Sequence, residues 1–568
     1  MTHEADALIR TIREAVIGDG RLVAGPFGAR PVVYADYTAS GRSLAFIEDF
    51  IRERVLPFYG NTHTEASYTA QHTTRLREEA RRIIARAVGA GAGDAVIFCG
   101  AGMTGAVDRL IDILGLRLPA GLDRRHGLRE RIPPAEKPVV FIGPYEHHSN
   151  ELPWRETVAD VVVVAEDADG RVDVADLERA LRRHAGRGLK IGSFSAASNV
   201  TGILTDVDRV TAALHRHGAL AFWDYAAAGP YVSLDMNPTG GGSAPSSLAK
   251  DAMLLSPHKF VGGPGTPGVL VVKRALLTNP VPSVPGGGTV AYVSPVDHRY
   301  LAQGEDREEG GTPAIVESIR AGLVFQLKAA VGVDSIRRRE DDFVRRALAA
   351  WTANPKLRIL GNTETDRLAV VSFLVRHGER YLHHDFVVAL LNDLFGIQAR
   401  GGCACAGPYG HRLLDIDLAR SRAFEKAAVA GCNGLKPGWV RVGFNYFFSE
   451  SQFAYIVAAV ELVAEHGWKL LARYRFDPAT GRWRHRDAPP PGPGLEAVSY
   501  GPGRMTFPAP AAAPARPLET YLAAARDILA AAPPEGAAAP ASTVPFPDLH
   551  WFPLSGEPER EGPSRRAV

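Results

Sequence analysis

Short apolar runs alternate with helically spaced apolar residues from about residue 31 to residue 275, and this alternation constrains the fold more than any other feature. Residues 94–99 and 161–165 are apolar runs typical of buried strands. Residues 76–87 and 173–184 have the spacing of amphipathic helices. Because repeated strand–helix–strand units build a mostly parallel sheet flanked by helices, we predict an α/β fold.

The length of 568 residues predicts several domains. We expect residues 1–30 to be an N-terminal segment that packs with a smaller domain, and residues 31–322 to form the large α/β domain. Residues 323–466 are predicted to be the smaller α+β C-terminal domain. Residues 467–568 are predicted to be a hairpin followed by a Pro/Ala-rich extension. The Arg- and Pro-rich insertion at residues 117–137 is expected to be a solvated loop.

Three local patterns mark elements in the C-terminal part of the chain. Ser449 and Gln452 are spaced as a capping box for the last helix of the smaller domain. Residues 474–486 have the pattern of a hairpin that turns at an Asp-Pro and a glycine. Residues 518–531 are predicted to form one helix within the extension.

Charge and cysteine usage limit the classes of protein. Lys and Arg number 65 and Asp and Glu number 63. The resulting net charge of +2 is too small to indicate a surface that binds nucleic acid or membranes. Four cysteines are too few for a disulfide framework and favour a reducing compartment. The charged N-terminus and the lack of a long apolar run point to an untargeted, cytoplasmic protein.

The segment SPHKFVGGPGTPGVLVV, residues 256–272, places Lys259 at a strand end beside a glycine-rich turn. A buried ammonium is costly unless it is paired or neutral, and a lysine that forms a Schiff base with an aldehyde cofactor avoids the cost covalently. Spacing alone would favour a surface lysine in a Gly-rich hairpin. Other segments of the chain favour the Schiff-base lysine over the surface lysine.

Four further features fit one cofactor, pyridoxal phosphate (PLP). Asp224 follows a predicted strand and can pair with the pyridinium nitrogen. Residues 100–110 form a strand–loop–helix junction whose amides and Thr104 hydroxyl can hold a phosphate, although this glycine-loop pattern is weak alone. His147 can stack on the ring, although histidine pairs are more often structural. Asn199 can donate a hydrogen bond to the phenolic oxygen.

From about residue 25 to residue 465, the chain resembles the fold-type-I PLP enzymes of the class V aminotransferase group, and especially the cysteine desulfurase and selenocysteine lyase branch. The resemblance implies that Lys259 carries the Schiff base. It also implies that Thr312, in a Gly-Gly-Thr-Pro segment, reaches the phosphate of a neighbouring subunit, and therefore a homodimer with shared active sites. The residues implied to bind the cofactor are Lys259, Asp224, His147, Asn199, Gly102, Met103, Thr104, Ser256, His258 and Thr312.

The segment ARGGCACAGPYG, residues 399–410, carries the predicted reactive thiol. Desulfurases similar to this chain place their persulfide-forming cysteine five residues after an arginine, and from Arg400 that spacing leads to Cys405. Cys403 is the nearby competitor, and both thiols could instead be small buried hydrophobes. Arg441 matches the family arginine that binds the substrate α-carboxylate, and Arg400 is the second candidate for that contact. The other two cysteines are expected to be structural.

One position departs from the family pattern. The family usually has a glutamine or histidine three residues after the pyridinium aspartate, where it contacts the phenolic oxygen of the cofactor. This chain has Ala227 there. The resemblance therefore implies that this hydrogen bond is lost and that the proton affinity of the cofactor imine is changed.

We therefore predict a PLP enzyme that cleaves the carbon–sulfur or carbon–selenium bond of a small α-amino acid through a persulfide on Cys405. Lys259 would move the α-proton, and His147 is a second candidate proton carrier. We expect a sulfur-acceptor protein as a partner. We expect no bound metal and no binding to nucleic acid or membranes. The alternatives are an aminotransferase, a β-eliminating lyase or an epimerase. A further alternative is a non-catalytic PLP-fold protein with a binding or regulatory role.

Overall fold

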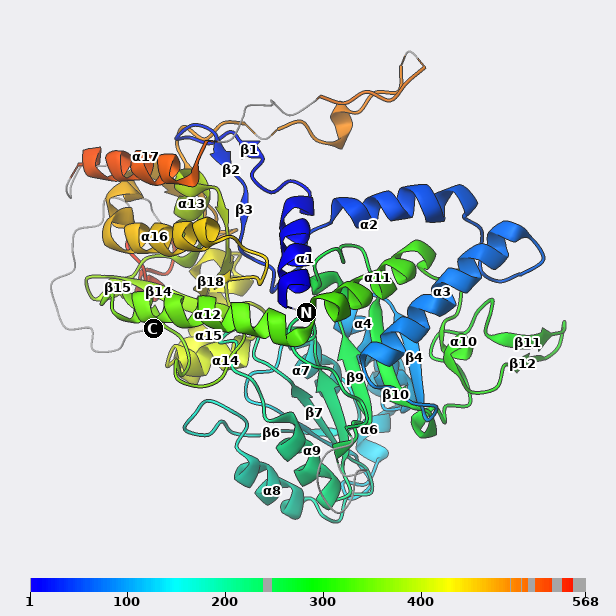
Figure 1. Cartoon of the computed structure of the whole chain (residues 1–568). Helices are drawn as coiled ribbons and strands as arrows, with labels where there is room; N and C mark the ends of the chain where they lie inside the picture. The colour runs from blue at the N-terminus through cyan, green and yellow to red at the C-terminus, as the bar shows by residue number, and fades with distance from the viewer. Residues whose placement is uncertain are drawn as a thin grey trace.

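The large domain is built on a seven-stranded sheet, shown below the centre of Figure 1 in this computed structural model. The structure describes residues 2–238, 248–490, 492–501, 503–508, 516–533 and 544–554. The strand order is β4-β10-β9-β8-β7-β5-β6, and only β10 runs against its neighbours. The strands are β4 (Asp94–Cys99), β5 (Val139–Ile142), β6 (Asp160–Val163), β7 (Lys190–Ser195), β8 (Leu220–Asp224), β9 (Ala252–Leu255) and β10 (Gly268–Lys273).

Both faces of the inner strands are buried, as the apolar runs predict, whereas the edge strand β6 is partly exposed and is not the buried strand predicted from residues 161–165. In β5, Val140 and Ile142 join the core cluster beneath α4, whereas Val139 and Phe141 join the larger core on the opposite face. The covering helices are α3 (Tyr68–Ala87), α4 (Gly102–Ile113), α7 (His148–Arg155), α8 (Val174–Arg183), α9 (Val207–Arg216) and α11 (Ile315–Val331). The predicted α/β layering is confirmed.

The smaller domain lies to the left of the large sheet in Figure 1. Its sheet has the order β13-β14-β18-β17, and β15 pairs with β14. Its elements are α12 (Val333–Thr352), β13 (Leu357–Ile359), β14 (Val370–His377), β15 (Arg380–Tyr381), α13 (His384–Phe395), β16 (Ile397–Gln398), β17 (Arg400–Gly402), α14 (Gly407–Leu413), α15 (Leu418–Val429), η6 (Asn433–Leu435), β18 (Trp439–Gly443) and α16 (Glu450–His466). The predicted capping box of Ser449 and Gln452 is present at the start of α16.

The N-terminal residues contact both parts of the chain. The β3 strand pairs in parallel with β16 of the smaller domain, and α1 packs on α11. The elements here are α1 (Thr2–Ala15), β1 (Leu22–Val23), β2 (Arg30–Pro31), β3 (Val33–Tyr34), α2 (Ala45–Phe50), η1 (Ile51–Val55) and η2 (Leu56–Phe58). The segment between β3 and α2 therefore lies where the two domains meet.

The C-terminal extension folds back onto the smaller domain. The predicted hairpin and helix are confirmed as β19 (Tyr474–Phe476) with β20 (Trp483–His485) and as α17 (Leu518–Ala531). Residues 544–554 also dock, because Trp551 is buried and its Nε1 donates to the Leu435 carbonyl at 3.0 Å. The remaining elements are η7 (Gly467–Arg473), η8 (Leu495–Ala497) and η9 (Pro547–Leu549). The Pro/Ala-rich stretches 509–515 and 534–543 lie outside the described residues.

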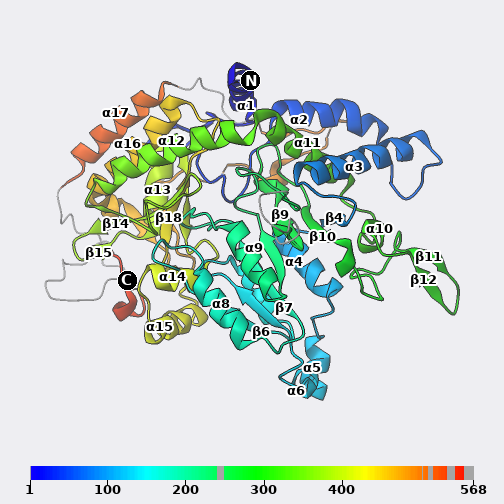
Figure 2. The same cartoon turned by 60° about the horizontal axis from the view of Figure 1, so that its bottom comes forward.

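The insertion at residues 117–137 is not the solvated loop that its Arg and Pro content predicts. It contains two short helices, α5 (Ala120–His126) and α6 (Leu128–Arg131), which project from the large domain in Figure 2. Gly127 joins them at a φ of 60°, a backbone conformation that favours glycine. The Arg and Pro content predicts a loop, but the basic residues lie on exposed helices, which share the polar composition of loops.

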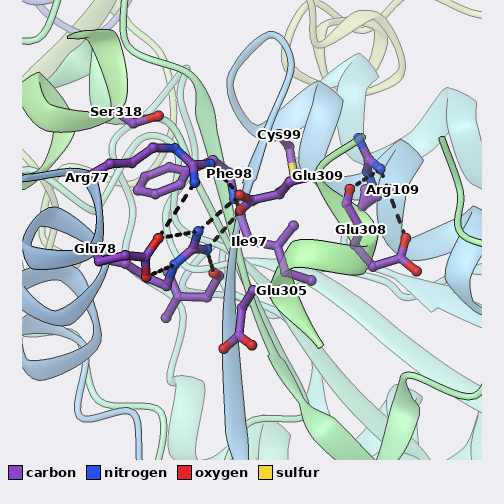
Figure 3. Close-up of polar contacts among 12 residues, drawn as sticks. Arg77, Glu78, Ile97, Phe98, Cys99, Arg109, Glu305, Glu308, Glu309 and Ser318 are labelled. Carbon is purple, nitrogen blue, oxygen red and sulfur yellow. Dashed lines mark hydrogen bonds and ion pairs between the residues drawn. The ribbon is translucent and has the colours of Figure 1, made fainter. Parts of the chain in front are cut away.

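A buried ion-pair network protects the edge of the large sheet (Figure 3). Strand β4 is an edge strand, and Glu309 accepts a hydrogen bond from Phe98 N at 2.6 Å, while Arg81 donates to the Val96 carbonyl. Arg77 and Arg81 both pair with the Glu309 carboxylate. The network therefore provides hydrogen-bond partners for β4 backbone groups that no neighbouring strand pairs. It also fixes the chain just before Gly310.

The segment between β10 and α11, which contains Glu309, also carries a small hairpin. Strands β11 (Val290–Val293) and β12 (His298–Tyr300) project at the right of Figure 1, and α10 (Glu305–Glu308) leads back to the sheet. The short 3-10 turns η4 (Pro257–Lys259) and η5 (Arg274–Leu276) complete the large domain. Among the helices of the described ranges, none has both the length and the apolar character needed to cross a membrane.

We predict that Glu309→Ala lowers the free energy of unfolding by about 3 kcal/mol, because it removes the buried carboxylate that Arg77 and Arg81 share and leaves them only the partly exposed Glu78. Glu305→Ala is the matched control, since Glu305 pairs with the half-exposed Arg274 and should cost less than about 1 kcal/mol. Urea unfolding followed by circular dichroism measures both values. Equal losses for the two variants would contradict the role given to Glu309.

Candidate functional site

A cavity of about 210 Å³ opens at the carboxyl ends of β7, β8 and β9. Open α/β sheets bind ligands at this edge because strand ends and helix starts converge there. The cavity draws on both domains and on the segment after β3. Its lining residues are Thr38, Ala39, Ala101, Gly102, Met103, Thr104, His147, Ser149, Ser195, Ala197, Asn199, Asp224, Ala226, Ala227, Ser256, His258, Lys259, Arg400, Ala404 and Arg441.

Lys259 and Asp224 are two buried titratable residues that line the cavity. Asp224 ends β8 and its Oδ1 accepts from Ala226 N at 2.7 Å, and Lys259 closes the short turn after β9. Removal from water lowers the pKa of Lys259 to about 8, although the nearby Asp224 carboxylate opposes this shift. Burial likewise raises the pKa of Asp224, while the Ala226 N–H and Lys259 oppose that rise. A large share of Lys259 is therefore neutral and nucleophilic near pH 8.

The start of α4 forms a cradle at one end of the cavity. Ser256 Oγ accepts from Met103 N at 2.8 Å, and Thr104 Oγ1 lies 2.7 Å from Ser149 Oγ. Gly102 has a φ of 53°, and a Cβ atom there would lie 2.9 Å from His258 Cε1. A side chain at this position would be strained and crowded, so glycine leaves room for an anion at the helix start, where Met103 N is already bonded to Ser256.

His147 presents its ring to the cavity from the N-cap position of α7. Ser149 N donates to its Nδ1 at 3.1 Å, so the ring proton is on Nε2. Burial, with the nearby Lys259 ammonium, lowers the pKa of His147 to about 3. The imidazole is therefore neutral at pH 7 and suits a flat contact with a planar ligand.

Asn199 is only partly satisfied. Its Nδ2 donates to the Ala404 carbonyl at 2.8 Å, and its Oδ1 is buried without a hydrogen-bond partner. Ala227 also lines the cavity and offers no polar side-chain atom. The second Nδ2 hydrogen of Asn199 can donate to a ligand oxygen, and its Oδ1 can accept from a ligand donor.

Arg441 and Arg400 share one carboxylate, that of Asp36. Arg441 Nη2 lies 2.8 Å from Asp36 Oδ1, and Arg400 Nε lies 2.9 Å from Asp36 Oδ2. Arg441 Nη1 also donates to the Asn199 carbonyl at 3.0 Å, whereas its Nε is buried and unpaired. Two guanidinium groups against one carboxylate leave one positive charge for an anionic group of a ligand.

The two cysteines of the 399–410 segment do not line the cavity, although Ala404 between them does. Cys405 is exposed and Cys403 is partly buried. Ala404 and Cys405 both have positive φ values, 50° and 56°, which L-residues rarely adopt. Cys99 is buried, and burial raises the pKa of its thiol to about 12; Cys432 is buried as well.

Thr312 also lies outside the cavity of its own chain. It is exposed and its Oγ1 accepts from Asn61 Nδ2 at 3.2 Å. Glu309, three residues earlier, is locked to β4 by the network in Figure 3. The segment that carries Thr312 is thus held firmly while its side chain faces outward.

Asp36 and Glu146 are the site residues that sequence reasoning missed. Asp36 follows a two-residue strand, and its partners are 364 and 405 residues away, so no local pattern marks it. Glu146 accepts hydrogen bonds from Ser195 N and Asn150 Nδ2, and burial raises its pKa to about 7. The unmatched positive charge of Arg400 and Arg441 was the available signal for an acidic partner.

A cluster of His383, His384 and Asp385 lies under the docked C-terminal segment. His383 Nδ1 accepts from Asp385 N at 3.1 Å, and its Nε2 lies 2.9 Å from the Gly434 carbonyl. Trp551 stacks on both imidazole rings. Because both nitrogens of His383 are already engaged, the cluster is explained by packing and hydrogen bonding.

The cavity fits pyridoxal phosphate on its own chemistry. Its lining includes an amine of lowered pKa, a buried carboxylate and a helix start at which glycine leaves room for an anion. The lining also includes the neutral imidazole of His147 and Asn199, whose buried Oδ1 has no hydrogen-bond partner. An aldehyde, a ring nitrogen and a phosphate would each find a complementary group.

Comparison with known proteins identifies relatives of this arrangement. Residues 33–446 match the family model described as Aminotransferase class-V. A probable cysteine desulfurase of Halalkalibacterium halodurans is 27% identical over 398 residues, which cover 69% of this chain and 88% of the relative. The cysteine desulfurase of Dickeya dadantii is 26% identical over 401 residues, which cover 70% and 88% of the two chains.

Solved structures show the same fold. The apo cysteine desulfurase of Thermococcus onnurineus NA1 superposes with a TM-score of 0.60 at 22% identity, covering 76% of this chain and 95% of that one. The cysteine desulfurase CsdA of Escherichia coli, in its S-sulfonic acid form, gives a TM-score of 0.58 at 22% identity, with coverages of 78% and 95%. The predicted fold-type-I architecture is therefore confirmed.

We predict that the rate at which added PLP forms a visible absorption band rises about tenfold between pH 7 and pH 9, because the neutral fraction of an amine with a pKa of about 8 rises by that factor. Stopped-flow absorbance measures the rate. Lys259→Ala should abolish the band, and Lys250→Ala, at a buried lysine paired with Asp208, should leave it. An inflection near the ordinary lysine pKa would contradict the environment described for Lys259.

Proposed function

Because the chain belongs to the class-V aminotransferase family, we propose that it binds PLP through Lys259 and releases sulfur or selenium from cysteine or selenocysteine. The single observation that carries this proposal is the shared cavity. Lys259, Asp224, Arg400 and Arg441 all line it, together with Ala404 of the cysteine segment. The relatives named as cysteine desulfurases support the same reaction.

Arg441 and Arg400 would bind the carboxylate of the amino acid. The α-carboxylate would meet Arg441, whose buried guanidinium has an unpaired Nε, and the exposed Arg400. Asp36 keeps the two guanidinium groups together and limits the excess charge to one. The site therefore favours a substrate with a single carboxylate next to its amine.

Bound PLP supplies an electron sink for the carbanion formed at the α-carbon. Asp224 would hold the proton of the ring nitrogen, and Asn199 would hydrogen-bond the phenolic oxygen in the absence of a side-chain donor at Ala227. Lys259, with its lowered pKa, would remove the α-proton and return it. His147, neutral at pH 7, would serve as the stacking plate.

Sulfur transfer requires a thiolate. Cys405 Sγ would form a bond to the substrate sulfur while the carbon–sulfur bond breaks. The electron pair of the broken bond stays on the substrate carbon, which takes a proton, so the products are alanine and a Cys405 persulfide. Because Cys405 is exposed, a protein acceptor could reach that persulfide, and we propose such an acceptor as a partner.

One observation favours a second outcome. Neither Cys403 nor Cys405 lines the cavity, and β-elimination from the same bound substrate needs no protein thiol. Transamination would also proceed without Cys405. The presence of Lys259, Asp224 and Arg441 in one cavity argues against a purely non-catalytic role.

We also propose a homodimer with shared sites in the cytoplasm. Thr312 points outward from a firmly held segment, where it could reach the phosphate of a second copy. The large domain also carries exposed apolar side chains that a second copy could cover: Leu56, Phe58, Tyr59, Val281, Val284, Tyr292 and Val293. Four free thiols suit a reducing compartment.

We predict that Cys405→Ser reduces alanine formation from cysteine by at least about a hundredfold, because the hydroxyl is a far weaker nucleophile than a thiolate. Substrate binding should persist, since Arg441 and Lys259 are unchanged. Cys403→Ser is the matched control and should stay within about threefold of wild type. Mass spectrometry of the products separates the outcomes. Unchanged alanine release from Cys405→Ser would exclude the persulfide, whereas pyruvate would indicate elimination.

Shared sites make a second prediction. Lys259→Ala and Thr312→Ala chains, each impaired alone, should regain activity when they are unfolded and refolded together. A mixed dimer can then contain one site with both Lys259 and Thr312 intact. Activity measured across mixing ratios should peak near equal amounts. Purely additive activities at every ratio would contradict a site built from two chains.

A further inference from the structure

His148, the residue after the stacking His147, contacts the cysteine segment at two points. Its backbone N–H donates to the Cys405 carbonyl at 2.8 Å. Its side-chain Nε2 accepts from Gly407 N at 2.9 Å. The imidazole is partly buried and does not line the cavity. His148 therefore contacts the backbone of the proposed reactive cysteine and the backbone two residues after it.

The segment needs such contacts because its backbone is unfavourable. Ala404 and Cys405 have φ values of 50° and 56°, and two consecutive L-residues in this region persist only where neighbours hold them. Asn199 Nδ2 holds the Ala404 carbonyl at 2.8 Å, and His148 holds the Cys405 carbonyl. Both anchoring residues belong to the large domain, whereas the cysteine segment belongs to the smaller one.

The protonation state of His148 suits this contact. Gly407 N donates to Nε2, so Nε2 carries no proton and the ring is neutral. Burial lowers the pKa of His148, with Arg155 adding to the shift and Glu151 opposing it. The acceptor is therefore available at neutral pH.

We propose that His148 is a positioning residue that fixes the Cys405 backbone relative to the cofactor plane, because His147, its neighbour in the chain, faces the cavity. This inference rests on the proposed function. The thiol lies outside the cavity in this conformation, so sulfur transfer depends on where the segment is held and on how it moves. Loss of the anchor should impair the transfer step and leave substrate binding intact.

The test compares His148→Phe, which removes the acceptor and keeps a flat ring, with His148→Gln, whose side-chain oxygen can still accept from Gly407 N. Hydrogen exchange of the full chain, followed by mass spectrometry, reports the peptide that contains residues 403–410. We expect exchange of the Gly407 amide to be about five- to tenfold faster in His148→Phe and near wild type in His148→Gln. Peptides from α13 are the internal reference.

Kinetics of the PLP-loaded enzyme with cysteine provide the second measurement. We expect kcat for alanine formation to fall at least about tenfold in His148→Phe with KM within about twofold, and His148→Gln to restore kcat. His184→Phe is the matched control, because His184 is another partly buried imidazole with a backbone contact, at Ala180. It should change neither measurement.

Each outcome decides the proposal. Unchanged exchange in His148→Phe would overturn the anchoring role, and faster exchange with an unchanged kcat would overturn the positioning role. If wild type makes no alanine, the proposed function fails, and the positioning role fails with it even where exchange shows the anchor. Should His148→Phe not fold, His148→Asn replaces it, because its shorter amide cannot reach Gly407 N and must give the same losses.

Discussion

The carboxylate of Asp36 is the interaction on which the geometry of the site depends. It lies between Arg400 of β17 and Arg441 of β18, and Arg441 also donates to the Asn199 carbonyl of the large domain. One carboxylate thus joins the N-terminal segment to the smaller domain, and Arg441 joins that domain to the large one. Without Asp36, the two guanidinium groups that line the cavity would lose the carboxylate they share.

The large sheet and the smaller domain contribute different chemistry to the cavity. Strand ends of the sheet supply the amine, the carboxylate and the anion cradle, which sit on rigid buried elements. The smaller domain supplies the arginines and the cysteine segment. Many polar and apolar contacts join the two domains, whereas Ala404 and Cys405 are held to the large domain by hydrogen bonds from Asn199 and His148. The position of the thiol therefore depends on a small number of hydrogen bonds.

The predictable part of the molecule is the part that follows from local patterns. Asp224, Ser256 and Lys259 lie in one cavity because parallel strands end at the same edge, which the apolar runs already indicate. Helix α17 and the β19–β20 hairpin agree with turn and periodicity signals. The functional roles of these residues, and the domain boundaries, stay predictions.

The unpredicted part depends on contacts between distant segments. Asp36 meets its arginines across most of the chain, and the left-handed backbone at Ala404 and Cys405 depends on Asn199 and His148. The exposure of Cys405 outside the cavity follows from those contacts and not from its spacing to Arg400. In the insertion at residues 117–137, composition hid two short helices because exposed helices and loops share the same polar residues.

The central claim is that Cys405 receives the sulfur atom of the substrate. The most direct measurement is the mass of the peptide that carries Cys405 after the PLP-loaded protein is incubated with cysteine, trapped with an alkylating agent and digested. The account predicts one added sulfur, about 32 Da, on Cys405 and none on Cys403. Consumption of cysteine with no added sulfur on either thiol would contradict it.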